Sequence, residues 1–316
     1  MLNILIIGIG NIGLRHLEAI AKLDVELQVF IIDNDESRFR TLQGTHLSIK
    51  YGTKLEELAF DQIIDYCIVS TTSEKRASII RDILKLVRVK TFILEKVLFQ
   101  AIQDYDHIYK LLAVKNSEAF VNCPRRIMGA YEELKKKFIN EQITKFEVRG
   151  GQWNMASNLI HFLDTLSFFL SDKWDNLHLD GNGLTEIIDS KHNAYKEFLG
   201  EVNGVIGGVV FTASSENINR DLTVSIQTNS KKYVINESKQ NLTIENQVDH
   251  SHTEETFRID YVSDSTNRFI INHLNGNSGL PKYDISMRLH LALIEMTIKQ
   301  QTRFFGENYS EKAMIT

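Results

Sequence analysis

Prolines and cysteines are scarce in this chain, with two of each among 316 residues. Cys67 and Cys123 both lie in apolar, strand-like stretches, which favours buried free thiols in a reducing cytoplasm over a disulfide. No apolar run approaches membrane-spanning length, and no basic leader precedes the first one. We therefore expect a cytoplasmic protein without a membrane partner.

Positive charge is also in deficit, because 36 basic residues face 41 acidic ones and leave a formal net charge of −5. Proteins that bind nucleic acid need a basic surface for the phosphates, so this balance argues against nucleic acid as a partner. The expected partner is a small molecule.

The first part of the chain alternates short apolar runs with helical patterns. Strands are expected at residues 3–8, 27–33, 47–52, 63–71 and 90–96, and helices at 12–23, 36–43, 74–87 and 101–115. This alternation predicts right-handed crossovers and a parallel sheet covered by helices on both faces. We assign residues 1–122 to a doubly wound, Rossmann-type α/β domain.

The pattern changes after residue 122. Alternating apolar and polar positions with Gly and Asn between them predict antiparallel strands at 197–214, 221–228, 231–238, 241–248 and 256–263. Helices are expected at 157–170 and 285–304. We assign residues 123–316 to a second, α+β domain with a large open antiparallel sheet. The open sheet also predicts a homodimer or homotetramer.

A glycine pattern follows the first strand directly and opens a helix: Gly8-x-Gly10-x-x-Gly13. In this context it predicts a dinucleotide-binding loop in which Gly8, Gly10 and Gly13, with Asn11 and Ile12, hold the pyrophosphate at the helix N-terminus. The alternative is a glycine-rich turn without a ligand. We prefer the cofactor site because the next strand ends as such a site requires.

That next strand ends at Asp33, 25 residues after Gly8. A carboxylate here can bond the adenosine ribose and repel a 2′-phosphate, which favours NAD over NADP. Asp33 could also cap a helix, and Arg38 could touch a phosphate. Ser70 and Thr71 end the fourth strand at the same edge, where a cofactor contact and a helix cap are equally plausible.

Glu95 and Lys96 interrupt an apolar run where the fifth strand ends. An edge ion pair is the simpler interpretation and would contribute little. At the mouth of a cofactor site, however, like charge and desolvation would disfavour the ammonium form of Lys96. Lys96 would then be a plausible proton carrier near neutral pH.

The helix at 157–170 carries a polar side that is rich in hydrogen-bonding groups. At about 100° per residue, one side gathers Ser157, Asn158, His161, Asp164, Thr165 and Phe168. A solvated face would usually show Lys and Glu, so this composition suits a site better. The other histidines lack metal-ligand spacing, and no metal is expected.

Together these residues resemble the glucose–fructose oxidoreductase, inositol dehydrogenase and rhizopine-catabolism family, Gfo/Idh/MocA. The resemblance spans the chain: "GIGNIGLRH" at the start, Glu95-Lys96, and His161-x-x-Asp164. It implies an NAD(P)-binding first domain and a second domain that binds sugar and often forms the dimer interface. By the same resemblance, Lys96 contacts substrate and nicotinamide, His161 is the general acid/base, and Arg15-His16 match a frequent pair after the glycines.

Three positions depart from the family pattern. Val97 replaces the proline after Glu-Lys, which removes a possible cis peptide bond, and Thr72 replaces a second proline. Ser157 stands where many members carry Asp four residues before the histidine, so a neutral group replaces one that titrates. Arg126 lies where members often place a basic or amide residue facing substrate.

The resulting prediction is an NAD(P)-dependent oxidoreductase that moves a hydride between nicotinamide and a hydroxyl or carbonyl carbon of a sugar or sugar derivative. The family type suggests surface-polysaccharide or nucleotide-sugar metabolism. His161 would move the hydroxyl proton and Lys96 would stabilise the oxygen, with Arg126, Ser157, Asn158 and Asp164 holding substrate. One alternative is a redox-neutral epimerase or eliminase that uses NAD transiently. Another is a non-catalytic regulatory protein that binds NAD or sugar.

Overall fold

The computed structural model describes residues 1–42, 46–58, 60, 62–191, 194–260, 264–277, 279–306 and 309–316. The chain divides into two compact units. The first contains Met1–Pro124, Tyr261–Met287 and Thr316, and the second contains Arg125–Asp260 and Arg288–Ile315. The predicted division into 1–122 and 123–316 differs from this one chiefly because Tyr261–Met287 returns to the first unit.

The first unit is built on a six-stranded parallel sheet in the order β3-β2-β1-β4-β5-β6. Its strands are β1 (Leu2–Ile7), β2 (Leu27–Ile32), β3 (Ser48–Gly52), β4 (Ile64–Val69), β5 (Val89–Leu94) and β6 (Glu118–Val121). The central strands are buried on both faces, as expected for a sheet between two helical layers. This confirms the doubly wound prediction and adds β6, which was not predicted.

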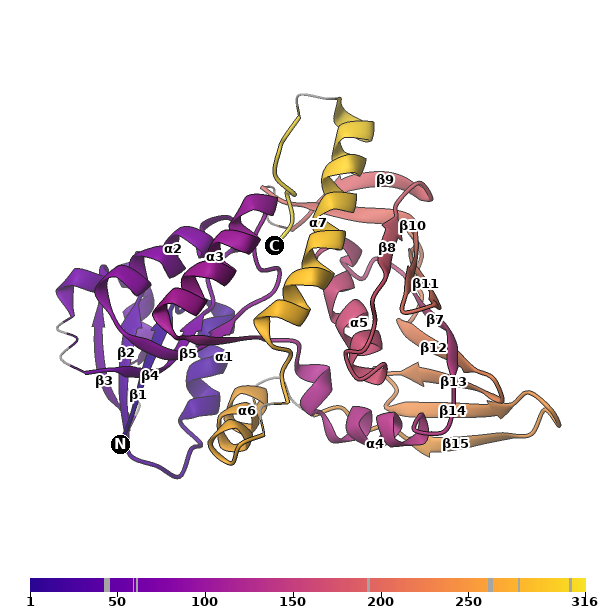
Figure 1. Cartoon of the computed structure of the whole chain (residues 1–316), viewed down its shortest axis with the longest axis horizontal. Coiled ribbons are helices and arrows are strands. Elements are labelled where there is room, and N and C mark those ends of the chain that lie inside the picture. Colours follow the sequence, from indigo (N-terminus) through magenta and orange to yellow (C-terminus); the bar gives the residue numbers. More distant parts are fainter. Residues whose placement is uncertain are drawn as a thin grey trace. The chain divides into compact units, whose positions relative to one another are not determined.

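Helices cover both faces of this sheet. In Figure 1, α2 (Ser73–Leu86) and α3 (Ile102–Lys115) lie together on one face, and α1 (Asn11–Ile20) and α6 (Ser265–Leu274) lie together on the other. Two short 3₁₀ helices, η1 (Glu36–Leu42) and η2 (Leu55–Glu57), follow β2 and β3. The predicted helix at 36–43 corresponds to η1, and its last residue lies outside the described residues.

The second unit is built on a nine-stranded sheet in the order β15-β14-β13-β12-β7-β11-β10-β8, with β9 also paired to β10. The strands are β7 (Ile143–Gly150), β8 (Leu177–Asp180), β9 (Leu184–Asp189), β10 (Lys196–Ile206), β11 (Val209–Ser215), β12 (Thr223–Thr228), β13 (Lys231–Asn236), β14 (Asn241–Asn246) and β15 (His252–Thr256). All pairs are antiparallel except β7 with β11, which run parallel. The large open sheet is therefore confirmed, but it is mixed.

Several details of the second unit differ from the sequence prediction. Strands β7, β8 and β9 and helix α4 (Gly129–Lys137) were not predicted. The strand predicted at 256–263 is wrong over residues 257–260, because β15 ends at Thr256; residues 261–263 lie outside the described residues. The short helix η3 (Pro124–Ile127) and the long helix α7 (Tyr283–Phe305) complete the elements, and α7 contributes residues to both units.

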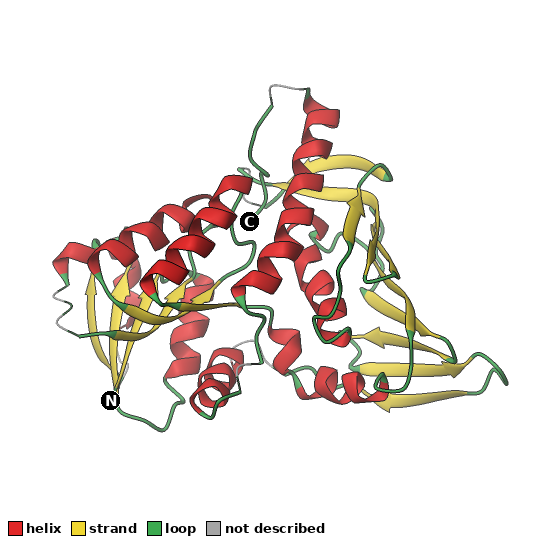
Figure 2. Ribbon diagram, viewed as in Figure 1, coloured by secondary structure: helices red, strands yellow, loops and turns green. Residues whose placement is uncertain are grey.

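Helix α5 (Met155–Phe169) packs against β10 and β11 of the second unit, on the helix-covered side of the sheet seen in Figure 2. Its apolar stripe is fully buried, with Leu159, Leu163 and Leu166 all inaccessible to solvent. Burying each such side chain contributes about 1.5–3 kcal/mol, so α5 is held firmly in its unit. Among the described residues, no helix combines the length and apolar character needed to cross a bilayer.

Candidate functional site

The turn between β1 and α1 has the close backbone packing that a dinucleotide loop needs. Gly8 adopts a φ of +88°, which favours glycine. A Cβ on Gly13 would lie 2.0 Å from the Gly8 carbonyl oxygen, so only glycine fits there. Gly10 is the N-cap of α1, and the N–H groups of Asn11, Ile12 and Gly13 therefore lie in the first turn, which has no intrahelical acceptors for them. The loop fits a pyrophosphate.

Asp33 follows β2, and its carboxylate accepts from two backbone N–H groups and one guanidinium at the same edge. Its Oδ2 accepts from the Ile9 N–H at 2.7 Å and from Arg38 Nη1 at 3.0 Å. Its Oδ1 accepts from the Asp35 N–H at 2.9 Å. The side chain of Asp33 is only 2% exposed, whereas that of Arg38 is 45% exposed. Arg38 also binds Asp35 at 3.3 Å, so two carboxylates compete for its charge.

This arrangement leads to a prediction about cofactor choice. Asp33→Asn keeps the shape of the side chain but removes the charge that would repel a 2′-phosphate and that holds Arg38. We expect the affinity for NADPH relative to NADH to rise about tenfold, measured by fluorescence titration of both cofactors. Asp24→Asn is the matched control, because Asp24 is an exposed aspartate of the same unit that lies before β2, whereas Asp33 follows that strand. An unchanged ratio in Asp33→Asn would remove Asp33 from cofactor selection.

Ser70 and Thr71, which follow β4, support the glycine loop. The Ser70 hydroxyl lies 2.7 Å from the Gly8 carbonyl and 3.1 Å from the Ile7 carbonyl. The Thr71 methyl lies 3.2 Å from where a Cβ on Gly8 would be. Thr72, the N-cap residue of α2, makes no side-chain hydrogen bond to that cap. These contacts of the Ser70 hydroxyl and the Thr71 methyl are with the loop expected to hold the cofactor.

Glu95, the residue after β5, lies in a buried hydrogen-bond network. Its Oε1 accepts from Asn122 Nδ2 at 2.5 Å and lies 3.0 Å from His16 Nε2. The other ring nitrogen of His16 lies 2.6 Å from the Thr266 hydroxyl. The pKa of Glu95 is lowered on balance. Burial acts to raise it, but the hydrogen bonds from His16 and Asn122 and the charge of Arg76 have the larger combined effect. Glu95 is an ionised anchor rather than a proton carrier.

The segment after Glu95 is held by Arg76 of α2. The buried Arg76 guanidinium donates to the carbonyls of Thr71, Val97 and Leu98. Val97 is itself fully buried, and Lys96 between these anchors is half buried. The expectation that Val97 removes a cis peptide was wrong, because the Lys96–Val97 bond is cis.

In the second unit, a carboxylate from β10 contacts the first turn of α5, the helix that carries His161. Glu197 of β10 is 6% exposed, and its Oε1 accepts from the Ser157 hydroxyl at 2.5 Å. Its Oε2 lies 3.3 Å from the Ser157 N–H. The Asn158 amide donates to the Trp153 carbonyl at 3.0 Å. His161, one turn after Ser157 on the same face, is half buried.

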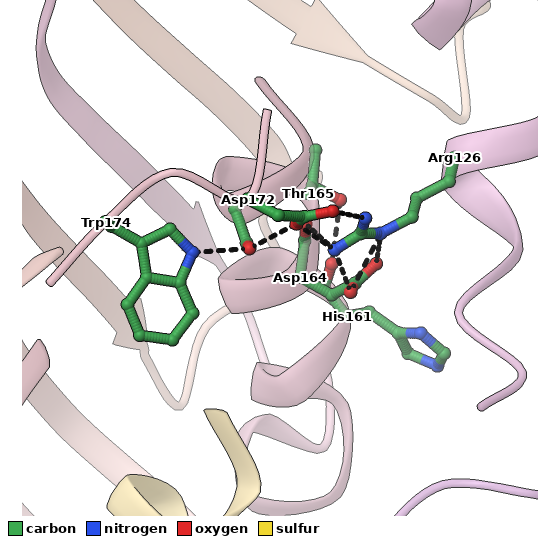
Figure 3. Close-up of polar contacts among 7 residues, drawn as sticks. Arg126, His161, Asp164, Thr165, Asp172 and Trp174 are labelled. Carbon is green, nitrogen blue, oxygen red and sulfur yellow. Dashed lines mark hydrogen bonds and ion pairs between the residues drawn. The ribbon is translucent and has the colours of Figure 1, made fainter. Parts of the chain in front are cut away.

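Asp164 and Arg126, both expected to bind substrate, bind each other (Figure 3). Arg126 Nε and Nη2 approach the Asp164 carboxylate at 2.8 and 2.7 Å. Arg126 also binds Asp172, whose Oδ1 accepts from the Ser167 hydroxyl at 2.7 Å. The side chains of Arg126 and Asp164 are 4% and 1% exposed. Their substrate roles stay predictions, and a structural role now stands beside them.

The pKa directions in this cluster follow burial and pairing. Burial raises the pKa of Asp164, although Arg126 acts against the rise. Burial also acts to raise the pKa of Asp172, but hydrogen bonds and charge from Arg126 lower it on balance. Figure 3 shows the His161 ring extending to one side of the cluster, while its carbonyl accepts from the Thr165 hydroxyl at 2.7 Å.

Four residues of these two sites were missed by the sequence analysis: Arg76, Asn122, Glu197 and Thr266. Arg76 had a signal, since it shares one face of its helix with Ile80 and Ile83, and an arginine on an apolar face is usually buried and paired. No such signal pointed to Glu197, because it is 40 residues from Ser157 in the sequence.

Among the described residues, no group of three or more His, Cys, Asp or Glu is placed to hold a metal ion.

Comparison with known proteins gives a family for the first unit. The model of the Gfo/Idh/MocA oxidoreductase family, described as an NAD-binding Rossmann fold, matches residues 2–123. This confirms the resemblance inferred from the sequence. No curated protein matches the sequence significantly.

Solved structures share the fold over nearly the whole chain. A super-repressor mutant of Gal80p from Saccharomyces cerevisiae has a TM-score of 0.73 at 15% identity, covering 97% of both chains. A Gfo/Idh/MocA oxidoreductase from Vibrio cholerae has 0.71 at 16% identity, covering 97% of this chain and 100% of that one. UDP-N-acetylglucosamine 3-dehydrogenase GnnA from Acidithiobacillus ferrooxidans has 0.71 at 11% identity, covering 93% and 96%. At these identities the likeness concerns the fold.

Proposed function

Residues 2–123 belong to the Gfo/Idh/MocA oxidoreductase family, and we propose that the chain is an NAD-dependent oxidoreductase of a sugar or sugar derivative. The observation that carries the proposal is the fixed placement of Lys96. The Glu95 network holds the residue before it, and Arg76 holds the carbonyls of the two residues after it. A surface lysine with no role would not need anchoring on both sides.

The residues of the first unit fit a bound NAD. The glycine loop and the helix N-terminus would contact the pyrophosphate, and Asp33 would contact the ribose. A side chain at position 13 would collide with the Gly8 carbonyl, which keeps this loop close-packed. When bound, the nicotinamide would accept or donate the hydride. The pairing of Arg38 with Asp33 and Asp35 leaves net negative charge at the ribose end, which supports NAD over NADP.

In the proposed reaction the protein moves one proton and stabilises one oxygen. His161 takes the proton from the substrate hydroxyl during oxidation, or returns it during reduction. Lys96 donates a hydrogen bond to the same oxygen as negative charge develops on it. Ser157 and Asn158 bond neighbouring hydroxyls. The similarity to GnnA, named as a UDP-N-acetylglucosamine dehydrogenase, supports nucleotide sugars as substrates to test first.

The test is a screen of neutral, acetamido and nucleotide-linked sugars with NAD+, followed through the ultraviolet absorbance of NADH, and of the corresponding keto-sugars with NADH. NADH binding is measured separately by fluorescence. Net NADH formation with one sugar supports the proposal. A bound cofactor with conversion of the sugar but no net NADH would indicate the redox-neutral alternative. Binding of NADH with no conversion of any sugar in either direction would contradict both the oxidoreductase proposal and the redox-neutral alternative.

A second candidate function is regulation without catalysis. The similarity to Gal80p from Kluyveromyces lactis, described as a transcriptional regulator, covers 96% of this chain and 93% of that chain, so this fold also occurs in a protein described that way. Such a protein would bind NAD or sugar and change its association with a partner. Turnover that depends on His161 would argue against this function.

A further inference from the structure

The contact between Glu197 and Ser157 determines what the Ser157 hydroxyl can do. A serine hydroxyl has one proton to donate and two lone pairs that accept. Its neighbours include Glu197 Oε1 at 2.5 Å and the Asn154 carbonyl at 3.2 Å, and both of these groups are acceptors. The single proton is therefore committed to the protein, most strongly to the carboxylate. Toward any further group, Ser157 acts as an acceptor.

Capping of α5 alone does not account for this geometry. Asn154, at the N-cap, makes no side-chain cap hydrogen bond, so a carboxylate from β10 could satisfy the first turn in its place. A cap, however, would be centred on the backbone N–H, and Glu197 lies 3.3 Å from the Ser157 N–H but 2.5 Å from its hydroxyl. The carboxylate is placed chiefly for the hydroxyl.

The two arginines that lie against α5, Arg125 and Arg126, are already paired. The Arg125 guanidinium carbon lies 4.5 Å from the centre of the Phe162 ring, and its Nε and Nη2 bind Glu237 at 2.8 and 2.9 Å. Arg126 is shared between Asp164 and Asp172. An anionic group of a ligand beside Ser157 would therefore meet an acceptor with a carboxylate behind it, and neither arginine is available to balance its charge.

We propose that Glu197 is a specificity-determining residue: it fixes the Ser157 hydroxyl as an acceptor one helical turn before His161, and so selects a neutral hydroxyl of the ligand over a carboxylate or phosphate at that place. The inference rests on the proposed function, because it takes the His161 face of α5 as the sugar site. It adds that the part of the sugar next to His161 is uncharged. Any anionic part of the substrate is bound elsewhere.

The test compares matched sugars that differ in one group, glucose with glucuronate and galactose with galacturonate. Their binding to the NADH-loaded protein is measured by calorimetry or saturation-transfer NMR, without turnover. The neutral sugar should bind at least about tenfold more tightly. Glu197→Gln is nearly isosteric, removes the charge and can donate to Ser157, which releases the hydroxyl proton. In Glu197→Gln, the affinity for the neutral sugar relative to the matched uronate should fall by about tenfold.

Two variants separate this role from simple capping. Glu201→Gln changes a half-exposed carboxylate on the same strand and should leave the preference unchanged. In a Ser157→Ala background, Glu197→Gln should narrow the preference less than it does alone, because the oriented hydroxyl is gone. A cap without a specificity role would lower the melting temperature in Glu197→Gln and leave the preference as it was.

Three outcomes overturn the inference: uronates that bind as tightly as the neutral sugars, an unchanged preference in Glu197→Gln, or no binding by any of the four sugars. Because the readout is binding, it fails independently of catalysis. Neutral sugars that bind with the expected preference but are not converted would leave Glu197 as the specificity residue of a non-catalytic site, and would contradict the oxidoreductase proposal alone.

Discussion

Replacing His161 with alanine is expected to lower kcat by about 10²–10⁴-fold, which is the usual contribution of a general acid or base. Replacing Lys96 with methionine is expected to lower it by about 10²–10³-fold, the usual loss on removing one donor to a developing oxyanion. NADH affinity should stay near that of the unchanged protein in His161→Ala. Steady-state kinetics with the sugar identified by the screen, together with NADH fluorescence titration, measure both quantities.

The double variant tests whether the two residues act in one reaction. His161 and Lys96 belong to different units of the chain, so no contact within a unit joins them. If both act on the same substrate oxygen, the losses in the double variant should be markedly smaller than the product of the single losses. Fully multiplicative losses would mean that they contribute to separate steps.

Matched controls come from exposed residues of the same types. His107→Ala and Lys110→Met change side chains on the solvent side of α3 and should leave kcat unchanged. Near-normal turnover in both His161→Ala and Lys96→Met would contradict the proposed mechanism. Turnover lost together with NADH binding and with a lower melting temperature would show damage to the fold instead of a catalytic role.

The features that sequence reasoning found are those whose evidence is contiguous in the chain. The glycine loop, Asp33 and Glu95-Lys96 each sit where an apolar strand stops, and the carboxyl ends of parallel strands meet at one edge. Strand apolarity alone was therefore enough to gather them. Strand β6 was missed because four residues, Glu118–Val121, are too short a run to separate from the preceding helix.

The features that were missed depend on contacts between distant segments. Glu197 reaches Ser157 only because β10 packs under α5, and nothing in the sequence around Glu197 specifies that pairing. Arg126 and Asp164 were singled out as substrate-binding candidates, but the ion pair between them could not be inferred from the sequence, where they lie 38 residues apart. The same physical signal, a charge in an apolar setting, predicts a site and a buried ion pair equally well. Geometry is needed to choose between them.

Arg126→Met is expected to cost about 3–5 kcal/mol of unfolding free energy, because it leaves two carboxylates without their shared cation. Asp164 is fully buried and would be left charged without its partner or forced to take a proton. Urea unfolding followed by tryptophan fluorescence suits this cluster, since Trp174 Nε1 donates to the Ser167 hydroxyl at 2.7 Å, next to Asp172.

A surface pair with similar chemistry provides the control. Arg149 contacts Glu147 at 2.6 Å, but its side chain is 50% exposed, so Arg149→Met should cost less than about 1 kcal/mol. A cost of Arg126→Met as small as this would show that the cluster does not hold the second unit together. If Arg126→Met then also lost sugar binding, the substrate role predicted for Arg126 from the sequence would be preferred.

Removing the stranded charge should restore part of the lost stability. Adding Asp164→Leu to Arg126→Met replaces the buried ion pair with apolar side chains of similar size, a change that is often neutral or stabilising. Recovery in the double variant means that Arg126→Met is destabilising because it strands the Asp164 charge. If the recovered protein also keeps its turnover, Arg126 and Asp164 serve the fold, and substrate contacts at α5 are left to Ser157, Asn158 and His161. If stability returns without turnover, the pair acts on substrate or on His161 as well.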